Sequence, residues 1–130
     1  LRSGFTTRDR RRMHFVGEDM DTFADRLERQ RSPRYVVIDS FQYTEYNFRQ
    51  YVEFRDRFAD KLIVFVSHSE GKQPAGRTAK KIMYDASLKI WVEGFRAFSK
   101  GRYIGRLGYY DVHPKSARKH WGDPQQTSLP

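Results

Sequence analysis

Cysteine is absent from this 130-residue chain. The absence excludes disulfide bonds, a cysteine nucleophile and thiolate zinc sites, and it fits a reducing cytoplasm, which is the location we expect. Long apolar runs are also missing. The longest, residues 62–66, has five residues, whereas a membrane-spanning helix needs about 18. We therefore expect no membrane partner.

Several catalytic patterns are missing as well. No serine lies in a Gly-x-Ser-x-Gly setting, which argues against a serine hydrolase. The four histidines have no metal-ligand spacing. The phosphate-binding pattern Gly-x-x-x-x-Gly-Lys-Ser/Thr does not occur, and the one Gly-Lys pair, Gly71-Lys72, lacks its upstream glycine.

Positive charge is abundant and lies at the two ends. The chain has 25 basic and 16 acidic residues, for a net charge of +9. Residues 1–12 contribute +4 and residues 95–121 contribute +6, while residues 13–94 are neutral. Basic edges attract phosphate groups. For residues 1–12 we favour the simpler explanation, solubility and a disordered arm, whereas aromatic residues between the charges of residues 95–121 favour a binding role.

Apolar periodicity predicts a parallel strand–helix–strand unit in the middle of the chain. Residues 35–38 and 62–66 are continuous apolar runs, typical of strands that are covered on both faces. Residues 19–31 and 45–60 have the apolar spacing of helices. A short strand over residues 13–16 is also expected.

The remaining chain predicts smaller elements. We expect a flexible loop, a short helix, an alternating edge strand, a β-hairpin that turns near Lys100-Gly101, and a last strand. These elements cover, in order, residues 69–77, 78–85, 88–93, 95–104 and 108–112. The expected organisation is a basic arm or loop, one domain and a flexible tail, over residues 1–12, 13–121 and 122–130.

Two polar residues follow the buried strands. Asp39 ends the first, and His68 follows Ser67 after the second. Ligands of open parallel sheets bind at the carboxyl ends of the strands, and a carboxylate there can hold Mg²⁺ through water beside a phosphate. A capping aspartate and a turn histidine are the structural alternatives, and the residues alone leave both open.

The order of these parts resembles the C-terminal half of the RecA-like P-loop ATPase core, which hexameric replicative helicases and the KaiC and RadA relatives share. The resemblance covers roughly residues 35–112. It implies an α/β fold: a partial three-layer α/β/α domain with a mostly parallel sheet and a C-terminal β-hairpin. It also implies that ATP and Mg²⁺ are cofactors of the complete protein.

The resemblance assigns roles to single residues. Asp39 would hold Mg²⁺ through water, with Ser40 and Ser67 beside the nucleotide, and His68 would sense the γ-phosphate. Lys100 and Arg102 match a Lys-x-Arg finger that reaches the nucleotide of a neighbouring subunit, which implies a homo-oligomer. The basic loop would contact single-stranded DNA. Its cations are Lys72, Arg77, Lys80 and Lys81.

Two departures from the family pattern limit the expected activity. The phosphate-binding loop is missing, and the catalytic glutamate belongs upstream, with Glu18 as a weak substitute. We therefore expect a fragment or a degenerate relative that does not hydrolyse ATP on its own. The alternative hypothesis is a non-catalytic basic module that binds single-stranded nucleic acid by charge and stacking.

Overall fold

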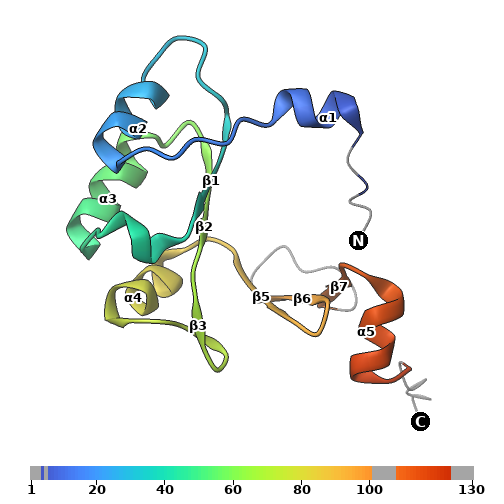
Figure 1. Ribbon diagram of the computed structural model, residues 1–130. Coiled ribbons are helices and arrows are strands. Elements are labelled where there is room, and N and C mark those ends of the chain that lie inside the picture. Colours follow the sequence, from blue (N-terminus) through green and yellow to red (C-terminus); the bar gives the residue numbers. More distant parts are fainter. Residues whose placement is uncertain (1–3, 5, 101–107, 124–130) are drawn as a thin grey trace. The chain divides into compact units, whose positions relative to one another are not determined.

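The computed structural model describes residue 4 and residues 6–100 and 108–123. Its contacts divide the chain into two compact units, Leu1–Val66 and Ser67–Pro130. Each unit mixes helices with small sheets, so the chain belongs to the α/β class in its broad sense (Figure 1). Arg102 and most of the predicted tail lie outside the described residues.

The first unit contains the predicted strand–helix–strand arrangement. Strand β1 (Tyr35–Asp39) pairs in parallel with β2 (Leu62–Val66), and helix α3 (Phe48–Arg57) connects them after a short 3₁₀ helix, Phe41–Thr44. The pairing is in register, from Tyr35 opposite Leu62 to Asp39 opposite Val66. This part of the prediction is confirmed.

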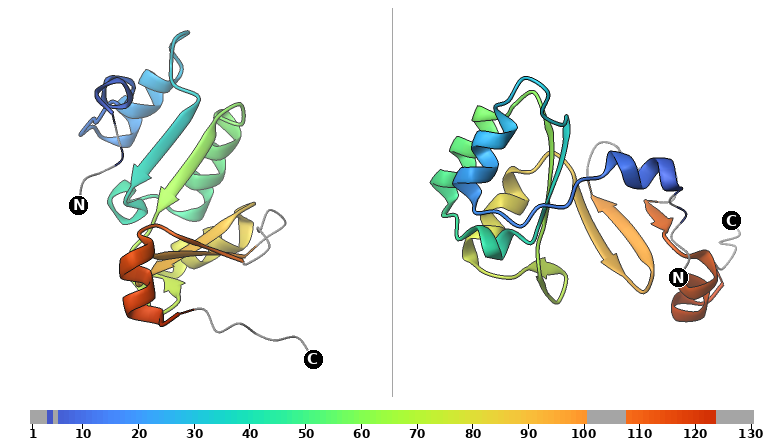
Figure 2. Two further views of the ribbon diagram at one scale, coloured as in Figure 1. Left: turned by 90° about the vertical axis from the view of Figure 1, so that its right-hand side faces the viewer. Right: turned by 45° about the horizontal axis from the view of Figure 1, so that its top comes forward.

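Two helices cover one face of the β1–β2 pair. Helix α2 (Met20–Leu27) and α3 lie on the same side of the strands (Figure 2). The core between helices and strands is aliphatic and aromatic, with every member at least nine-tenths buried. It consists of Ala24, Leu27, Val36, Ile38, Phe54 and Phe58.

The other face of the pair is exposed, which overturns the prediction that both faces are covered. Tyr35, Val37 and Leu62 are 76%, 63% and 60% exposed. The reason is geometric: side chains alternate along a strand, and both covering helices in this unit lie on one side. A continuous apolar run does not distinguish one covered face from two.

Residues 13–16 do not form a strand, so that prediction is also wrong. They follow a short helix, α1 (Thr7–Arg12), which lies within the predicted basic arm. The helix begins with a capping box, because the Thr6 hydroxyl accepts the Asp9 N–H while the Asp9 carboxylate accepts the Thr6 N–H. Local capping therefore gives regular structure to a segment without an apolar period.

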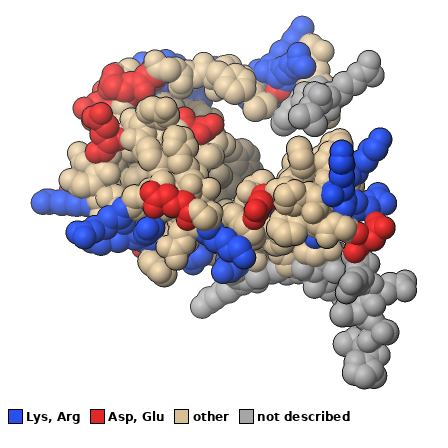
Figure 3. Space-filling model, turned by 60° about the horizontal axis from the view of Figure 1, so that its bottom comes forward, with Lys and Arg blue, Asp and Glu red and all other residues tan. Residues whose placement is uncertain are grey.

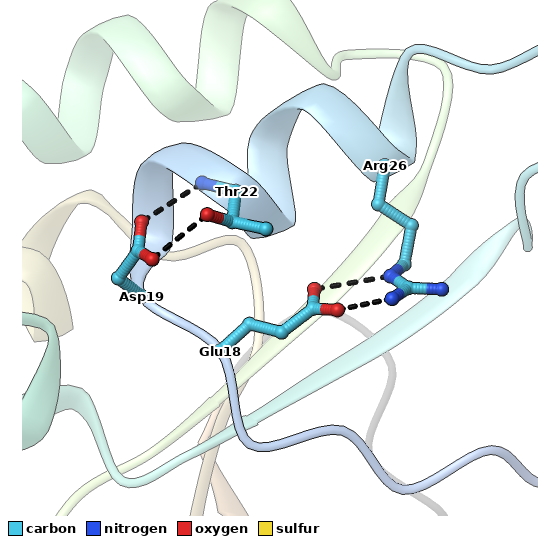
Figure 4. A network of polar contacts seen from close by, with 4 residues as sticks. All are labelled: Glu18, Asp19, Thr22 and Arg26. Carbon is cyan, nitrogen blue, oxygen red and sulfur yellow. Dashed lines mark hydrogen bonds and ion pairs between the residues drawn. The ribbon is translucent and has the colours of Figure 1, made fainter.

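Carboxylates anchor α2 at its start. Asp19 caps the helix by accepting the N–H and hydroxyl of Thr22, at 2.9 and 2.8 Å. The preceding Glu18 binds Arg26 in the last turn through both carboxylate oxygens (Figure 4). The hydrogen bond from Arg26 lowers the pKa of Glu18, and the Thr22 N–H lowers the pKa of Asp19.

These shifts predict that acid destabilises the first unit. Each folded-state pKa lies below its unfolded value, so the stabilisation is present above about pH 4.5 and is lost as pH falls through the folded pKa. Glu28 follows the same direction because Arg57 binds it. We expect the protection factors of amides in β1 and β2, which compare the measured exchange with the intrinsic rate at the same pH, to fall below about pH 4.5, and to fall less in Glu18→Gln. Protection factors that rise in acid would contradict the account.

The second unit begins with a small antiparallel hairpin, β3 (Ser69–Glu70) and β4 (Gln73–Pro74), where a loop is predicted. Helix α4 (Arg77–Asp85) follows and confirms the predicted short helix. The hairpin reverses at Gly71, whose φ of 63° favours glycine. The predicted loop therefore carries its cations on a hairpin and on the start of a helix.

A three-stranded antiparallel sheet follows. Strand β6 (Arg96–Lys100) lies between β5 (Lys89–Glu93) and β7 (Tyr109–Asp111). Strands β5 and β6 are joined by a turn at Gly94-Phe95, with φ values of 52° and 62°. Lys100 ends a strand and pairs with Lys89. The turn predicted near Lys100-Gly101 lies at the edge of the described residues, because residues 101–107 are outside them.

Helix α5 (Pro114–Trp121) completes the second unit and was not predicted. Its start has clear signals: Pro114 occupies the first turn, and the His113 ring accepts the Ser116 N–H. Among the described residues no helix is long and apolar enough to cross a membrane. The described strands form one parallel pair and two antiparallel sheets.

Candidate nucleotide site and basic surface

Asp39 lies at the carboxyl end of β1, as predicted. Its side chain is exposed, and alternation places it on the same uncovered face as Tyr35 and Val37. The peptide bond to Ser40 is cis. Ser40 is 2% exposed, and its carbonyl accepts the Tyr43 N–H at 3.0 Å. A carboxylate in this position is accessible to a hydrated cation.

Ser67 and His68 come directly after β2 and begin the second unit. The Ser67 hydroxyl donates to the carbonyl of His68 at 2.9 Å. That carbonyl also accepts the N–H of Ala75 at 2.7 Å. The backbone at His68 is thus bonded to the residue that follows β4. This hydrogen bond connects His68 to the end of the β3–β4 hairpin, which together with the start of α4 (residues 69–81) we call the basic hairpin.

The four predicted nucleic-acid contacts lie on or near this hairpin. Lys72 follows Gly71 at its tip, and its ammonium lies 5.0 Å from the centre of the Trp91 ring. Lys80 forms an ion pair with Glu70 at 3.6 Å. Arg77 and Lys81 lie on α4. The structure therefore brings these cations into one segment of the second unit.

The three-stranded sheet has a cluster of a cation and aromatic rings. The sequence shows that basic and aromatic residues alternate here, but not which of them are in contact. Arg96 is 9% exposed, donates to Asp111 at 2.6 Å and lies 4.0 Å from the Tyr109 ring centre. The Asp111 hydrogen bond raises the pKa of Arg96. Phe98 stacks on Trp91, with ring centres 4.7 Å apart. The rings of this cluster are half-buried and pack on one another and on Trp121 of α5.

Basic side chains gather in several separate groups in the view of Figure 3, with acidic side chains between some of them. Among the described residues no group of three or more histidines and carboxylates could hold a metal ion. A groove in the first unit, lined by Leu27, Arg34, Arg57 and Lys61, lies at the amino end of the strands. This is the end opposite to Asp39, where open parallel sheets do not bind their ligands.

Comparison with known proteins gave no match to a family model, a curated protein or a solved structure. Asp39 and Ser40 are consecutive residues of the first unit. Ser67, His68 and the basic hairpin lie in the second unit. Lys100 ends β6, and Arg102 lies outside the described residues.

Proposed function

We propose that these 130 residues are the C-terminal part of a RecA-like ATP-binding domain that works with nucleic acid and forms a homo-oligomer. The supporting observation is the in-register parallel pair β1–β2, with Asp39 as the last residue of one strand and Ser67-His68 directly after the other. The proposed fold of the complete protein is the three-layer domain with a mostly parallel sheet, in which residues outside these 130 would cover the exposed face of β1 and β2.

Each polar residue has a role in this proposal. Asp39 holds a water of the Mg²⁺ that accompanies ATP, and Ser67 lines the nucleotide site. Ser40 is buried and would not contact the nucleotide with its side chain. His68 senses the γ-phosphate. Its carbonyl is bonded to Ala75 of the basic hairpin, which provides a route from the nucleotide to the DNA-contacting cations. Hydrolysis needs a phosphate-binding loop that the 130 residues do not contain.

The experiment is an ATPase assay on the complete protein that the gene encodes. Asp39→Asn should lower kcat on the order of 10²-fold, because the amide no longer neutralises charge around Mg²⁺. Asp60→Asn is the matched control, since Asp60 is exposed and precedes β2 at the opposite end of the strands. Equal kcat values for Asp39→Asn and the unsubstituted protein would contradict the assignment.

A second candidate function is a non-catalytic module for single-stranded nucleic acid. The observation that favours it is the hairpin cation Lys72, together with Arg77 and the lysines of α4. The two candidates differ in one requirement: the module needs neither ATP nor Asp39. Nucleic-acid binding that ignores ATP and survives Asp39→Asn in the complete protein would favour the module.

A further inference from the structure

The short helix α1 has one face made of arginine. At 3.6 residues per turn, Arg8, Arg11 and Arg12 fall within an arc of about 100°. Arg10 points to the opposite side. We call Arg8, Arg11 and Arg12 the arginine face.

The arginine face has no structural task in the described residues. Helix α1 contains no buried residue, and all four of its arginines are exposed. Within the part of the chain that the structure describes, none of them has an ion-pair partner. The carboxylate of Asp9 accepts the N–H and hydroxyl of Thr6 and offsets one of the four arginine charges of the helix. Three guanidinium groups are thus held on one face of a helix whose net charge is +3.

An exposed apolar segment follows the helix directly. Phe15 is 89% exposed, and Met13 and Val16 are 44% and 45% exposed. The segment is extended and projects with α1 away from α2 and α3 in the first unit (Figure 1). An exposed ring beside unpaired guanidinium groups is the combination with which proteins bind single-stranded nucleic acid, by stacking on bases and by contacts to phosphates.

We propose that the arginine face and Phe15 bind single-stranded nucleic acid, with the three guanidinium groups on successive phosphates and the ring on a base. Arginine favours this ligand because its planar fork matches phosphate oxygens. A membrane surface fits less well, since α1 has no apolar side chain and is therefore not an amphipathic helix of the kind that binds at lipid interfaces. This surface is separate in sequence from the basic hairpin, and its binding does not depend on the proposed ATP site.

The test is fluorescence anisotropy of a labelled 30-nucleotide single strand, titrated with the 130-residue chain at several salt concentrations. Changing Arg8, Arg11 and Arg12 together to glutamine removes three phosphate contacts. The slope of log K against log salt should fall by about 2, and affinity at 0.1 M salt should fall on the order of 10²-fold. Phe15→Ala should cost on the order of tenfold without changing the slope.

The matched control removes three other exposed charges by changing Arg29, Arg31 and Arg34 to glutamine. This control lowers the net charge by the same amount as the arginine-face variant, and it should change the slope of log K against log salt much less. Because α1 buries nothing, the arginine-face variant should keep the thermal midpoint of the parent chain. Equal losses of affinity in the two triple variants would overturn the proposal, as would absence of binding to the single strand at about 50 mM salt. Binding of the chain to anionic vesicles, with an affinity that falls in the arginine-face variant while its affinity for the single strand does not, would overturn it as well. The ATPase assay above is unaffected by these outcomes, so the two proposals fail separately.

Discussion

Phe54→Ala is expected to lower the free energy of unfolding of the first unit by about 4 kcal/mol. Phe54 is 4% exposed and lies at the centre of the only core that joins α3 to the β1–β2 pair in the described residues. Its ring contacts those of Tyr46, Phe58 and Phe65, with centres 6.0, 4.9 and 6.4 Å apart. Alanine would remove these contacts and leave a cavity that α3 cannot close without moving off the strands.

Urea unfolding followed by far-UV circular dichroism measures this change, and amide exchange in β1 assigns it to the first unit. The control is Phe15→Ala, which removes the same atoms from an 89% exposed position and should change stability by less than about 0.5 kcal/mol. If both variants lost the same small amount, the packing of α3 on the strands would be wrong.

Loss of the proposed finger is expected to have the largest effect on activity. In the complete protein, Lys100→Gln with Arg102→Gln should lower kcat by about 10³-fold or more, the range for a cation that neutralises the transferring phosphoryl group. Lys100 ends β6 opposite Lys89. Lys89→Gln is therefore the matched control, because it removes a charge from the same cross-strand pair and should leave kcat nearly unchanged.

Mixing subunits separates a finger that acts on a neighbour from one that acts within its own subunit. An equal mixture of the finger variant and Asp39→Asn should regain about one quarter of the activity, since one interface in four then joins an intact Asp39 to an intact finger. Either variant alone stays inactive. Absence of recovery after verified subunit exchange would mean that Lys100 and Arg102 do not act across an interface.

Elements with strong local signals were predictable from the sequence. Helix α2 has an aspartate cap and an apolar stripe, and β1 and β2 are apolar runs joined by a helix of suitable length, so their parallel pairing followed. Whether the second face of the β1–β2 pair is buried was not predictable, because it depends on which side of the strands the helices pack. Helix α5 was not predicted, although Pro114 and the capping His113 mark its start.

The candidate site was predictable only where it follows strand ends. Asp39 lies at the carboxyl end of β1, because a strand that pairs over its whole length leaves its last residue at the sheet edge. The contacts of Lys72 with Trp91 and of Lys80 with Glu70 were not predictable. They depend on the β3–β4 hairpin, and the glycines and proline of this segment indicate a loop without specifying a hairpin. Helix α1 was likewise not predictable, because its segment has no apolar periodicity.

The central claim is that Asp39, Ser67 and His68 belong to an ATP site whose phosphate-binding loop lies outside these 130 residues. The most direct measurement is the nucleotide sequence upstream of the codon for Leu1. The account predicts that the reading frame continues to an apolar strand followed by Gly-x-x-x-x-Gly-Lys-Ser/Thr, with a strand-ending glutamate after the next helix. A reading frame that starts just before Leu1, with no such loop, would contradict it.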